Sequence, residues 1–136
     1  MRPVGTASDV AEAYARYSFG VDKGRAEVIE SCFALESSIG TVGQPPTVGR
    51  EAIAERLMRL ADPAAVHHAF NIVVLEATAD DVLARADFTI AKHGAVFAMG
   101  HYDDSLTRLP DLGWVFSRRI VTYTWRARRP NDKEIP

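Results

Sequence analysis

The chain has 136 residues, 47% of them hydrophobic and 25% charged, a composition typical of a single globular domain. Sixteen Lys and Arg residues against eighteen Asp and Glu give a formal net charge of −2, so there is no overall positive field to bind nucleic acid. One cysteine excludes an intramolecular disulfide, and neither an apolar secretory signal nor a run of ~18 apolar residues is present, so we expect a cytoplasmic protein without a membrane anchor.

Apolar residues recur at helical spacing near the start of the chain. Between Ala7 and Val21 they follow steps of four, three and four, which place them on one face of a helix. They are Val10, Tyr14, Tyr17 and Val21. The sequence Asp22-Lys23-Gly24 then ends this helix. A second, shorter helical stripe follows at Val28, Ile29, Cys32 and Phe33.

The stretch after the second helix is predicted as a loop. A strand is conceivable through Ile39 and Val42, but this segment runs directly into Gly43-Gln44-Pro45-Pro46. Two adjacent prolines lack backbone N–H donors and disfavour a regular element. A third amphipathic helix is then predicted from Arg50 to Ala61, and Asp62-Pro63 ends it.

The second half of the chain consists of long β-branched and aromatic runs. They span residues 66–77, 82–92, 95–108 and 113–128, with short polar connections between them. Short connections imply neighbouring antiparallel strands. The sequence therefore predicts an α+β fold in which three N-terminal helices pack on a curved, mainly antiparallel sheet. We expect one domain over residues 1–130 and a polar tail over residues 131–136 that frays.

Two adjacent histidines stand out in the first predicted strand. Their side chains, His67 and His68, must point to opposite faces of the sheet, and periodicity leaves open which of them faces the helices. His67 shares its face with the small Ala69 and the polar Asn71, which suit the wall of a ligand pocket. The face of His68 is more uniformly apolar and suits packing. A hydrogen-bonded structural histidine is the alternative interpretation.

Asp22 is a lone acid at the end of an apolar helix. Asp two residues before Gly is common turn chemistry. A carboxylate near a helix C-terminus, however, meets the negative end of the helix dipole, at a cost of ~0.3–1 kcal/mol that a nearby imidazolium would offset. A carboxylate that can reach an imidazole is also the minimal equipment for removing a proton from carbon. The sequence permits a pair between Asp22 and His67.

Other chemistries have little support in the sequence. No His-Glu-x-x-His or paired-cysteine spacing is present, so we predict no metal site. Cys32 lies on a packing stripe and no Gly-x-Ser-x-Gly turn occurs, so we predict no serine or cysteine nucleophile. Most of the charges at Arg85, Asp87, Asp103, Asp104 and Arg108 are predicted to be solvated.

Several motifs follow one another in a familiar order over nearly the whole chain. They are residues 13–24 (AYARYSFGVDKG), Phe33, residues 49–53 (GREAI), His67 with Asn71, residues 100–104 (GHYDD) and residues 113–116 (GWVF). This order resembles the SnoaL-like branch of the nuclear transport factor 2-like superfamily. Within that branch the chain is similar to the group of scytalone dehydratase, lindane dehydrochlorinase and the small subunits of ring-hydroxylating dioxygenases.

The resemblance implies a cone-shaped α+β barrel with an apolar pocket, and a homo-oligomer, either a dimer or a trimer. It also implies an Asp–His dyad at Asp22 and His67, with Arg108 as the arginine that assists departure of the leaving group. The tyrosine that precedes the acid in scytalone dehydratase is Val21 here, so dehydratase chemistry of that specific type is not implied.

We therefore expect a cofactor-independent lyase or isomerase that acts on a small, largely apolar or aromatic ring compound through an Asp22–His67 general-base dyad. The residues predicted to line the substrate site are Asn71, Tyr14, Tyr17 and Ala69. No cofactor or metal is expected. The alternative is a non-catalytic small-molecule-binding protein or an accessory subunit, because this fold is reused and fold does not determine function.

Overall fold

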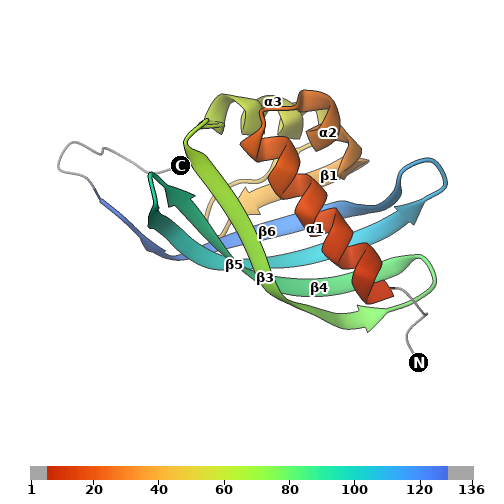
Figure 1. The fold of residues 1–136 in the computed structure, drawn as a ribbon. Helices are drawn as coiled ribbons and strands as arrows, with labels where there is room; N and C mark the ends of the chain where they lie inside the picture. The colour runs from red at the N-terminus through yellow and green to blue at the C-terminus, as the bar shows by residue number, and fades with distance from the viewer. Residues whose placement is uncertain (1–5, 129–136) are drawn as a thin grey trace.

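A computed structural model describes residues 6–128, so the predicted tail at 131–136 lies outside the described residues. The helices are α1 (Thr6–Asp22), α2 (Ala26–Ser31) and α3 (Arg50–Leu60). The strands are β1 (Phe33–Thr41), β2 (Thr47–Val48), β3 (Ala65–Ala77), β4 (Asp81–Lys92), β5 (Ala95–Leu109) and β6 (Gly113–Arg126). The strands form one sheet in the order β2-β1-β6-β5-β4-β3 (Figure 1).

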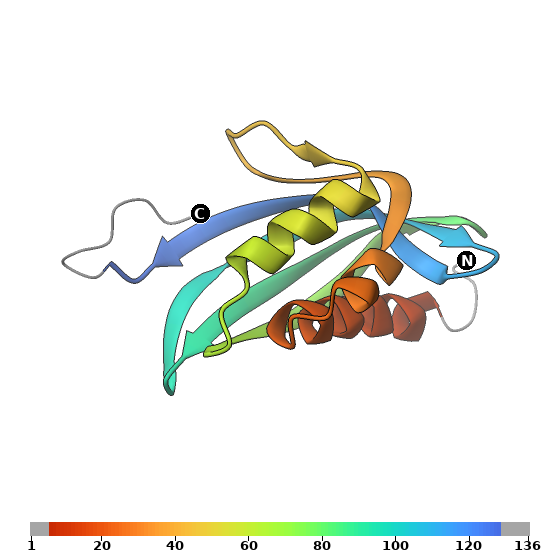
Figure 2. The same cartoon turned by 90° about the horizontal axis from the view of Figure 1, so that it is seen from above.

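The three helices lie on one face of this curved sheet (Figures 1 and 2). The strand pairs are antiparallel except for β1 and β6, which run parallel. The predicted α+β class is confirmed, but the sheet stays open within residues 6–128, with β2 and β3 at its edges. None of the helices in the same range is long and apolar enough to cross a membrane.

The bend of the sheet comes from irregular pairing along β5. Register shifts occur between Met99 and Gly100 and between Ser105 and Leu106 in the pairing with β6. Such bulges kink a strand and increase its twist. Gly100 permits the close approach, because a Cβ atom there would lie 2.0 Å from the backbone oxygen of Thr122. The bent sheet thereby forms a concave face under the helices.

The stretch predicted as a loop is largely the strand β1, so that prediction was wrong. β1 starts at Phe33, which we had assigned to the second helix, and it runs to Thr41 before the Gly-Pro turn. Its pairing explains the error. β1 joins β6 in parallel, with Ile39 opposite Arg119, and a partner some 80 residues away leaves no local pattern.

A bulge at Asn71 decides which histidine faces the helices. Asn71 has a φ of 52°, and the pairing of β3 with β4 slips between Phe70 and Val73. Before the bulge His67 and Ala69 are half-buried under the helices, whereas His68 is exposed. After the bulge the inward face passes to Ile72 and Val74. The strict alternation assumed from the sequence therefore holds only up to residue 70.

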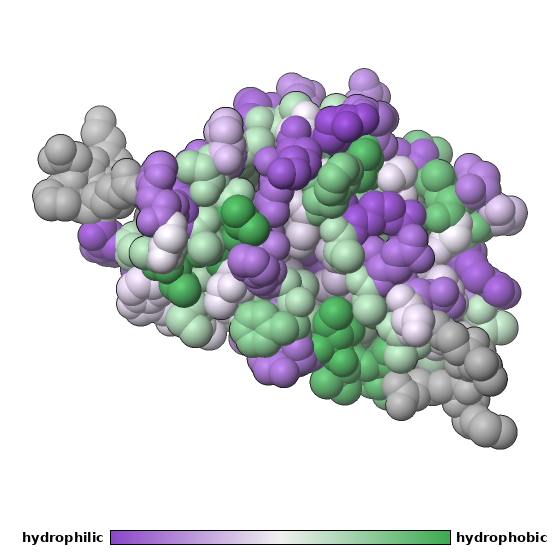
Figure 3. Space-filling model, in the orientation of Figure 1, coloured by the Kyte–Doolittle hydropathy of each residue, from purple (hydrophilic) through white to green (hydrophobic). Residues whose placement is uncertain are grey.

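The molecular surface carries apolar side chains among charged ones (Figure 3). Four of the exposed large apolar side chains lie along β3 at the edge of the sheet. They are Val66, Phe70, Val73 and Leu75.

Candidate active site

Asp22 and His67 are in direct contact. Asp22 is the last residue of α1 and His67 is the third residue of β3, so the end of the helix meets the start of the strand. The carboxylate oxygen Oδ1 lies 2.6 Å from the ring nitrogen Nδ1. The backbone N–H of His67 also donates to both carboxylate oxygens, at 3.1 and 3.0 Å. The two side chains are only 14% and 16% exposed, so this contact is shielded from water.

This contact explains how a carboxylate is tolerated at the C-terminal end of a helix. The helix dipole disfavours a negative charge there. Asp22, however, accepts both an imidazole N–H and a backbone N–H from the edge strand, and hydrogen bonds to a charged acceptor are the strong ones. Such a bond at Nδ1 places the neutral ring's proton on that nitrogen and leaves Nε2 unprotonated.

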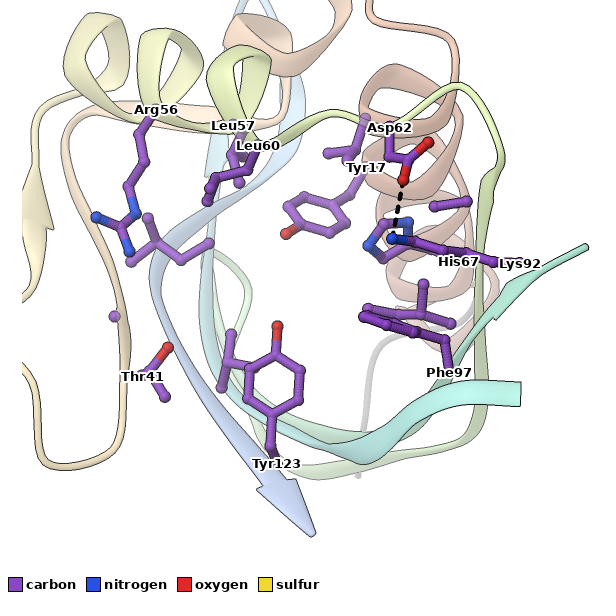
Figure 4. A pocket seen from close by; sticks show the side chains of 16 residues that line it. Tyr17, Thr41, Arg56, Leu57, Leu60, Asp62, His67, Lys92, Phe97 and Tyr123 are labelled. Carbon is purple, nitrogen blue, oxygen red and sulfur yellow. Dashed lines mark ion pairs between the residues drawn. The ribbon is translucent and has the colours of Figure 1, made fainter. Parts of the chain in front are cut away.

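The ring of His67 forms part of the wall of a cavity of about 200 Å³ between the helices and the sheet (Figure 4). Most of the wall is apolar. These apolar residues are Val21, Ile39, Leu57, Leu60, Ala65, Ile90, Phe97 and Val121. An apolar engineered cavity of ~150 Å³ is large enough for benzene, so this space suits one small ring with a substituent.

The hydroxyls of Tyr17 and Tyr123 point into the cavity (Figure 4). Burial raises the pKa of Tyr17 to about 12. Burial likewise raises the pKa of Tyr123, and nearby Arg126 and Arg56 only partly oppose this. Both phenols are therefore neutral hydrogen-bond donors at neutral pH. Tyr17 was predicted from the sequence, whereas Tyr123 was missed because its strand gave no sign of facing a cavity.

Charged side chains also reach the cavity. Lys92, near the end of β4, forms an ion pair of 2.8 Å with Asp62, and its ammonium lies 4.1 Å from the centre of the Phe97 ring. Arg56 extends into the cavity from α3 on the side away from His67 (Figure 4). None of these charges was assigned to the site from the sequence.

A buried polar cluster lies beside the cavity, under α1. Arg119 donates to Asp104 through two nitrogens, at 2.8 and 3.0 Å, and neither side chain is exposed. The hydroxyl of Tyr14 also donates to Asp104. The guanidinium carbon of Arg119 lies 3.7 Å from the centre of the Tyr102 ring and 4.3 Å from that of Tyr17. Through Arg119 the cluster thus contacts Tyr17, one of the two tyrosines that line the cavity.

Asp104 is an exception to the prediction that most charges on these strands are solvated. Asp104 has Tyr102 and Leu106 as neighbours on the same strand face, and both are buried. An acid placed between two large apolar residues at alternating positions was the available signal for burial. Its partner Arg119 lies directly opposite on β6, a register that the sequence alone did not specify.

Arg108 is not part of the site, contrary to the role implied for it. Its side chain is 53% exposed and forms an ion pair of 3.0 Å with Asp80, in the turn between β3 and β4. That turn lies at the opposite end of β3 from His67. Arg108 lies at this end of the sheet because the strand register pairs it with Trp114 next to the β5–β6 turn.

Three predicted substrate-binding residues also lie outside the cavity wall. The amide nitrogen of Asn71 donates to Asp87 at 2.9 Å on the exposed face of the bulge. Tyr14 is buried in the polar cluster with Asp104 and is only 1% exposed. Ala69 packs against the core. Of the four residues, only Tyr17 lines the cavity. Among residues 6–128, no group of three or more His, Cys, Asp or Glu side chains could hold a metal ion.

The family model of the SnoaL-like domain matches residues 5–120. The chain belongs to the SnoaL-like domain family. No curated protein matches it in sequence. The resemblance to the SnoaL-like branch inferred from the sequence is therefore confirmed.

Solved structures show the same SnoaL-like fold. A Nostoc punctiforme protein of unknown function with a cystatin-like fold has a TM-score of 0.80 at 14% identity, over 96% of both chains. A hexachlorocyclohexane dehydrochlorinase from Novosphingobium barchaimii has a TM-score of 0.78 at 16% identity, over 98% of this chain and 96% of its own. A ketosteroid isomerase-like protein from Erwinia carotovora atroseptica has a TM-score of 0.69 at 15% identity, over 90% of this chain and 99% of its own.

Proposed function

We propose that this SnoaL-like protein is a cofactor-independent lyase or isomerase that removes a proton from a carbon atom of a small cyclic ligand. The observation that carries the proposal is the pairing of Asp22 with His67 at the wall of an apolar cavity. Two proteins of similar structure are named as a dehydrochlorinase and as a ketosteroid isomerase-like protein, and both names support this reaction class.

In the proposed reaction Asp22 holds the Nδ1–H tautomer of His67, and Nε2 accepts the proton from the ligand. The electron pair of the broken C–H bond moves toward the neighbouring carbon. It either expels a leaving group there, which gives a lyase, or is held as an enolate until His67 returns the proton at another carbon, which gives an isomerase. Asp22 stabilises the imidazolium in both cases.

The developing negative charge needs a donor, because a general base contributes only ~10²–10⁴-fold to the rate. The neutral hydroxyls of Tyr17 and Tyr123 face the cavity and can donate to an enolate oxygen or to a leaving group. Tyr17 is also held close to the Arg119 guanidinium, which lies 4.3 Å from the centre of its ring. Most of the wall around the same space is apolar.

The test is proton exchange with solvent. The protein is mixed in D₂O with 3-hydroxycyclohexanone and with 3-cyclohexenone, and NMR follows deuterium uptake, loss of water or movement of the double bond. We expect catalysis by the wild type and a loss of ~10²–10⁴-fold in His67→Ala. His68→Ala is the matched control. The side chain of His68 is exposed, so its removal should leave the rate unchanged. Full activity in a folded His67→Ala variant would refute the proposal.

A further inference from the structure

Within the part of the chain that the structure describes, one cation of the cavity has no counter-ion, the guanidinium of Arg56. Among residues 6–128 no acceptor forms a hydrogen bond or an ion pair with it, and the other charges of the cavity are paired. Asp62 binds Lys92, and Asp22 binds His67. A ligand that enters the cavity can therefore supply the counter-ion of Arg56.

The other charges of α3 explain why Arg56 has no ion-pair partner among the described residues. The adjacent acid Glu55 forms an ion pair of 3.1 Å with Arg59, one turn further along. Arg59 is 64% exposed, so that pair lies on the solvent face of α3. Arg56 points the other way, into the cavity and next to Leu57 and Leu60 (Figure 4).

Two uncharged polar groups of the cavity wall, on Tyr123 and Thr41, do not neutralise Arg56. Tyr123 lies close enough for Arg56 to lower its pKa, but burial raises that pKa more, so the phenol stays neutral. Thr41, on the same side of the cavity, carries a hydroxyl without charge (Figure 4). A guanidinium offers a planar pair of N–H donors that fits a carboxylate, and such a pair is stronger where water is partly excluded.

The positions of Arg56 and His67 define two ends of the cavity. The two residues lie on opposite sides, and the hydroxyls of Tyr17 and Tyr123 lie between them (Figure 4). A ring compound held by a charged group at Arg56 would therefore present its far side to the imidazole. Such an anchor turns a loosely held apolar ligand into an oriented one.

We propose that the ligands of this cavity are small ring compounds that carry a carboxylate, which Arg56 binds. This inference rests on the proposed function only in taking the same cavity as the substrate site. It narrows the substrate class from apolar rings in general to monocyclic acids with an apolar body. It also assigns Arg56 as the residue that discriminates an acid from a neutral compound of the same shape.

The experiment compares benzoate with benzamide by titration calorimetry at neutral pH and low salt. We expect the wild type to bind benzoate at least about tenfold more tightly, equivalent to about 1.4 kcal/mol. Arg56→Met should reduce benzoate affinity to that of benzamide and leave benzamide affinity unchanged. Arg56→Lys should keep part of the preference, since it keeps the charge but loses the planar pair of donors.

A control variant locates the effect. Arg59→Met removes a positive charge from the solvent face of the same helix and should keep the preference for benzoate. Circular dichroism and the unfolding midpoint establish that each variant is folded. Equal affinity of the wild type for both probes, absence of benzoate binding, or a preference that survives in folded Arg56→Met would overturn the proposal.

The same variants separate this inference from the catalytic proposal. His67→Ala should lose proton exchange but keep the preference for benzoate. If His67→Ala keeps exchange while Arg56→Met loses the preference, the carboxylate site stands and the general-base role fails. If Arg56→Met keeps the preference while His67→Ala loses exchange, the carboxylate site fails and the general-base role stands.

Discussion

The carboxylate of Asp22 binds His67 through the backbone as well as through the ring. β3 is an edge strand within the described sheet, and the backbone N–H of His67 has no strand partner on that side. Asp22 satisfies this donor and the imidazole with one group. The end of α1, the start of β3 and the candidate base are therefore fixed by a single side chain.

We expect Asp22→Asn to change the tautomer of His67 while preserving the fold. An asparagine side chain has one acceptor oxygen for the two donors of His67, and its amide can donate to Nδ1. The ring proton should then move to Nε2, which removes the base from the cavity. Long-range ¹⁵N–¹H NMR of the imidazole measures the tautomer directly. An unchanged Nδ1–H tautomer in the variant would show that Asp22 does not select it.

Asp22→Ala should also lower stability, because it leaves both donors of His67 without their acceptor. Loss of an acceptor for a shielded donor costs about 1–3 kcal/mol. Urea unfolding of Asp22→Ala beside the wild type gives this difference. His68→Ala serves as the reference, since His68 is exposed on the other face of β3 and should shift the free energy of unfolding by less than about 0.5 kcal/mol.

The buried pair of Asp104 and Arg119 should contribute far more to stability than the exposed pair of Asp80 and Arg108. Asp104→Ala leaves an uncompensated guanidinium in the core, which costs about 3–5 kcal/mol. Asp80→Ala breaks a pair whose side chains are 68% and 53% exposed, and such pairs contribute about 0–1 kcal/mol. Chemical denaturation of the two variants provides the comparison. Similar losses would contradict the described burial of Asp104.

We expect Asn71 to be needed for the backbone conformation of the bulge in β3 and not for ligand binding. Its φ of 52° suits glycine and asparagine but disfavours β-branched residues. We expect Asn71→Gly to keep stability within about 1 kcal/mol and Asn71→Val to lose more. Neither change should alter benzoate binding, because Asn71 lies outside the cavity wall. A selective loss of ligand affinity in Asn71→Gly would restore the substrate-binding role predicted from the sequence.

Cys32 should be unreactive in the folded protein. Burial raises the pKa of its thiol to about 11, well above the ~8.5 of an exposed cysteine. Since the folded pKa is the higher one, the thiol favours the folded state below pH ~8.5, and this contribution is lost as the pH rises toward 11. Labelling by a disulfide reagent at pH 8 should therefore follow unfolding. Over pH 8–10.5, the stability of Cys32→Ala should fall less than that of the wild type.

The local pattern was sufficient for the elements whose partners are close in sequence. The apolar stripe from Val10 to Val21 predicted α1, and the three short turns after β3 predicted the antiparallel strands. β1 was missed because it pairs with β6, which is distant in the chain. The bulge at Asn71 was missed because periodicity assumes an uninterrupted strand.

The residues of the candidate site likewise divide into those that the sequence indicated and those that only the structure revealed. Asp22 and His67 were found because an acid at a helix end and a histidine at a strand start are locally unusual, and because the surrounding motifs resemble a family. The sequence did not show that Arg108 is exposed or that Asp104 is buried, because burial depends on strand register across β5 and β6. Arg56 and Tyr123 entered the cavity only through the packing of α3 over the bent sheet.

By itself the sequence determined the fold class and the order of the helices and most strands, since helical spacing, alternation and turn residues act over short distances along the chain. It also singled out Asp22 and His67, which the structure places in contact. Only the tertiary structure decided that Arg119 is buried with Asp104, that Arg108 lies at the far end of the sheet, and that Arg56 has no hydrogen-bond or ion-pair partner within residues 6–128. Burial and pairing of a charge depend on groups brought together from distant segments, and no local pattern contains that information.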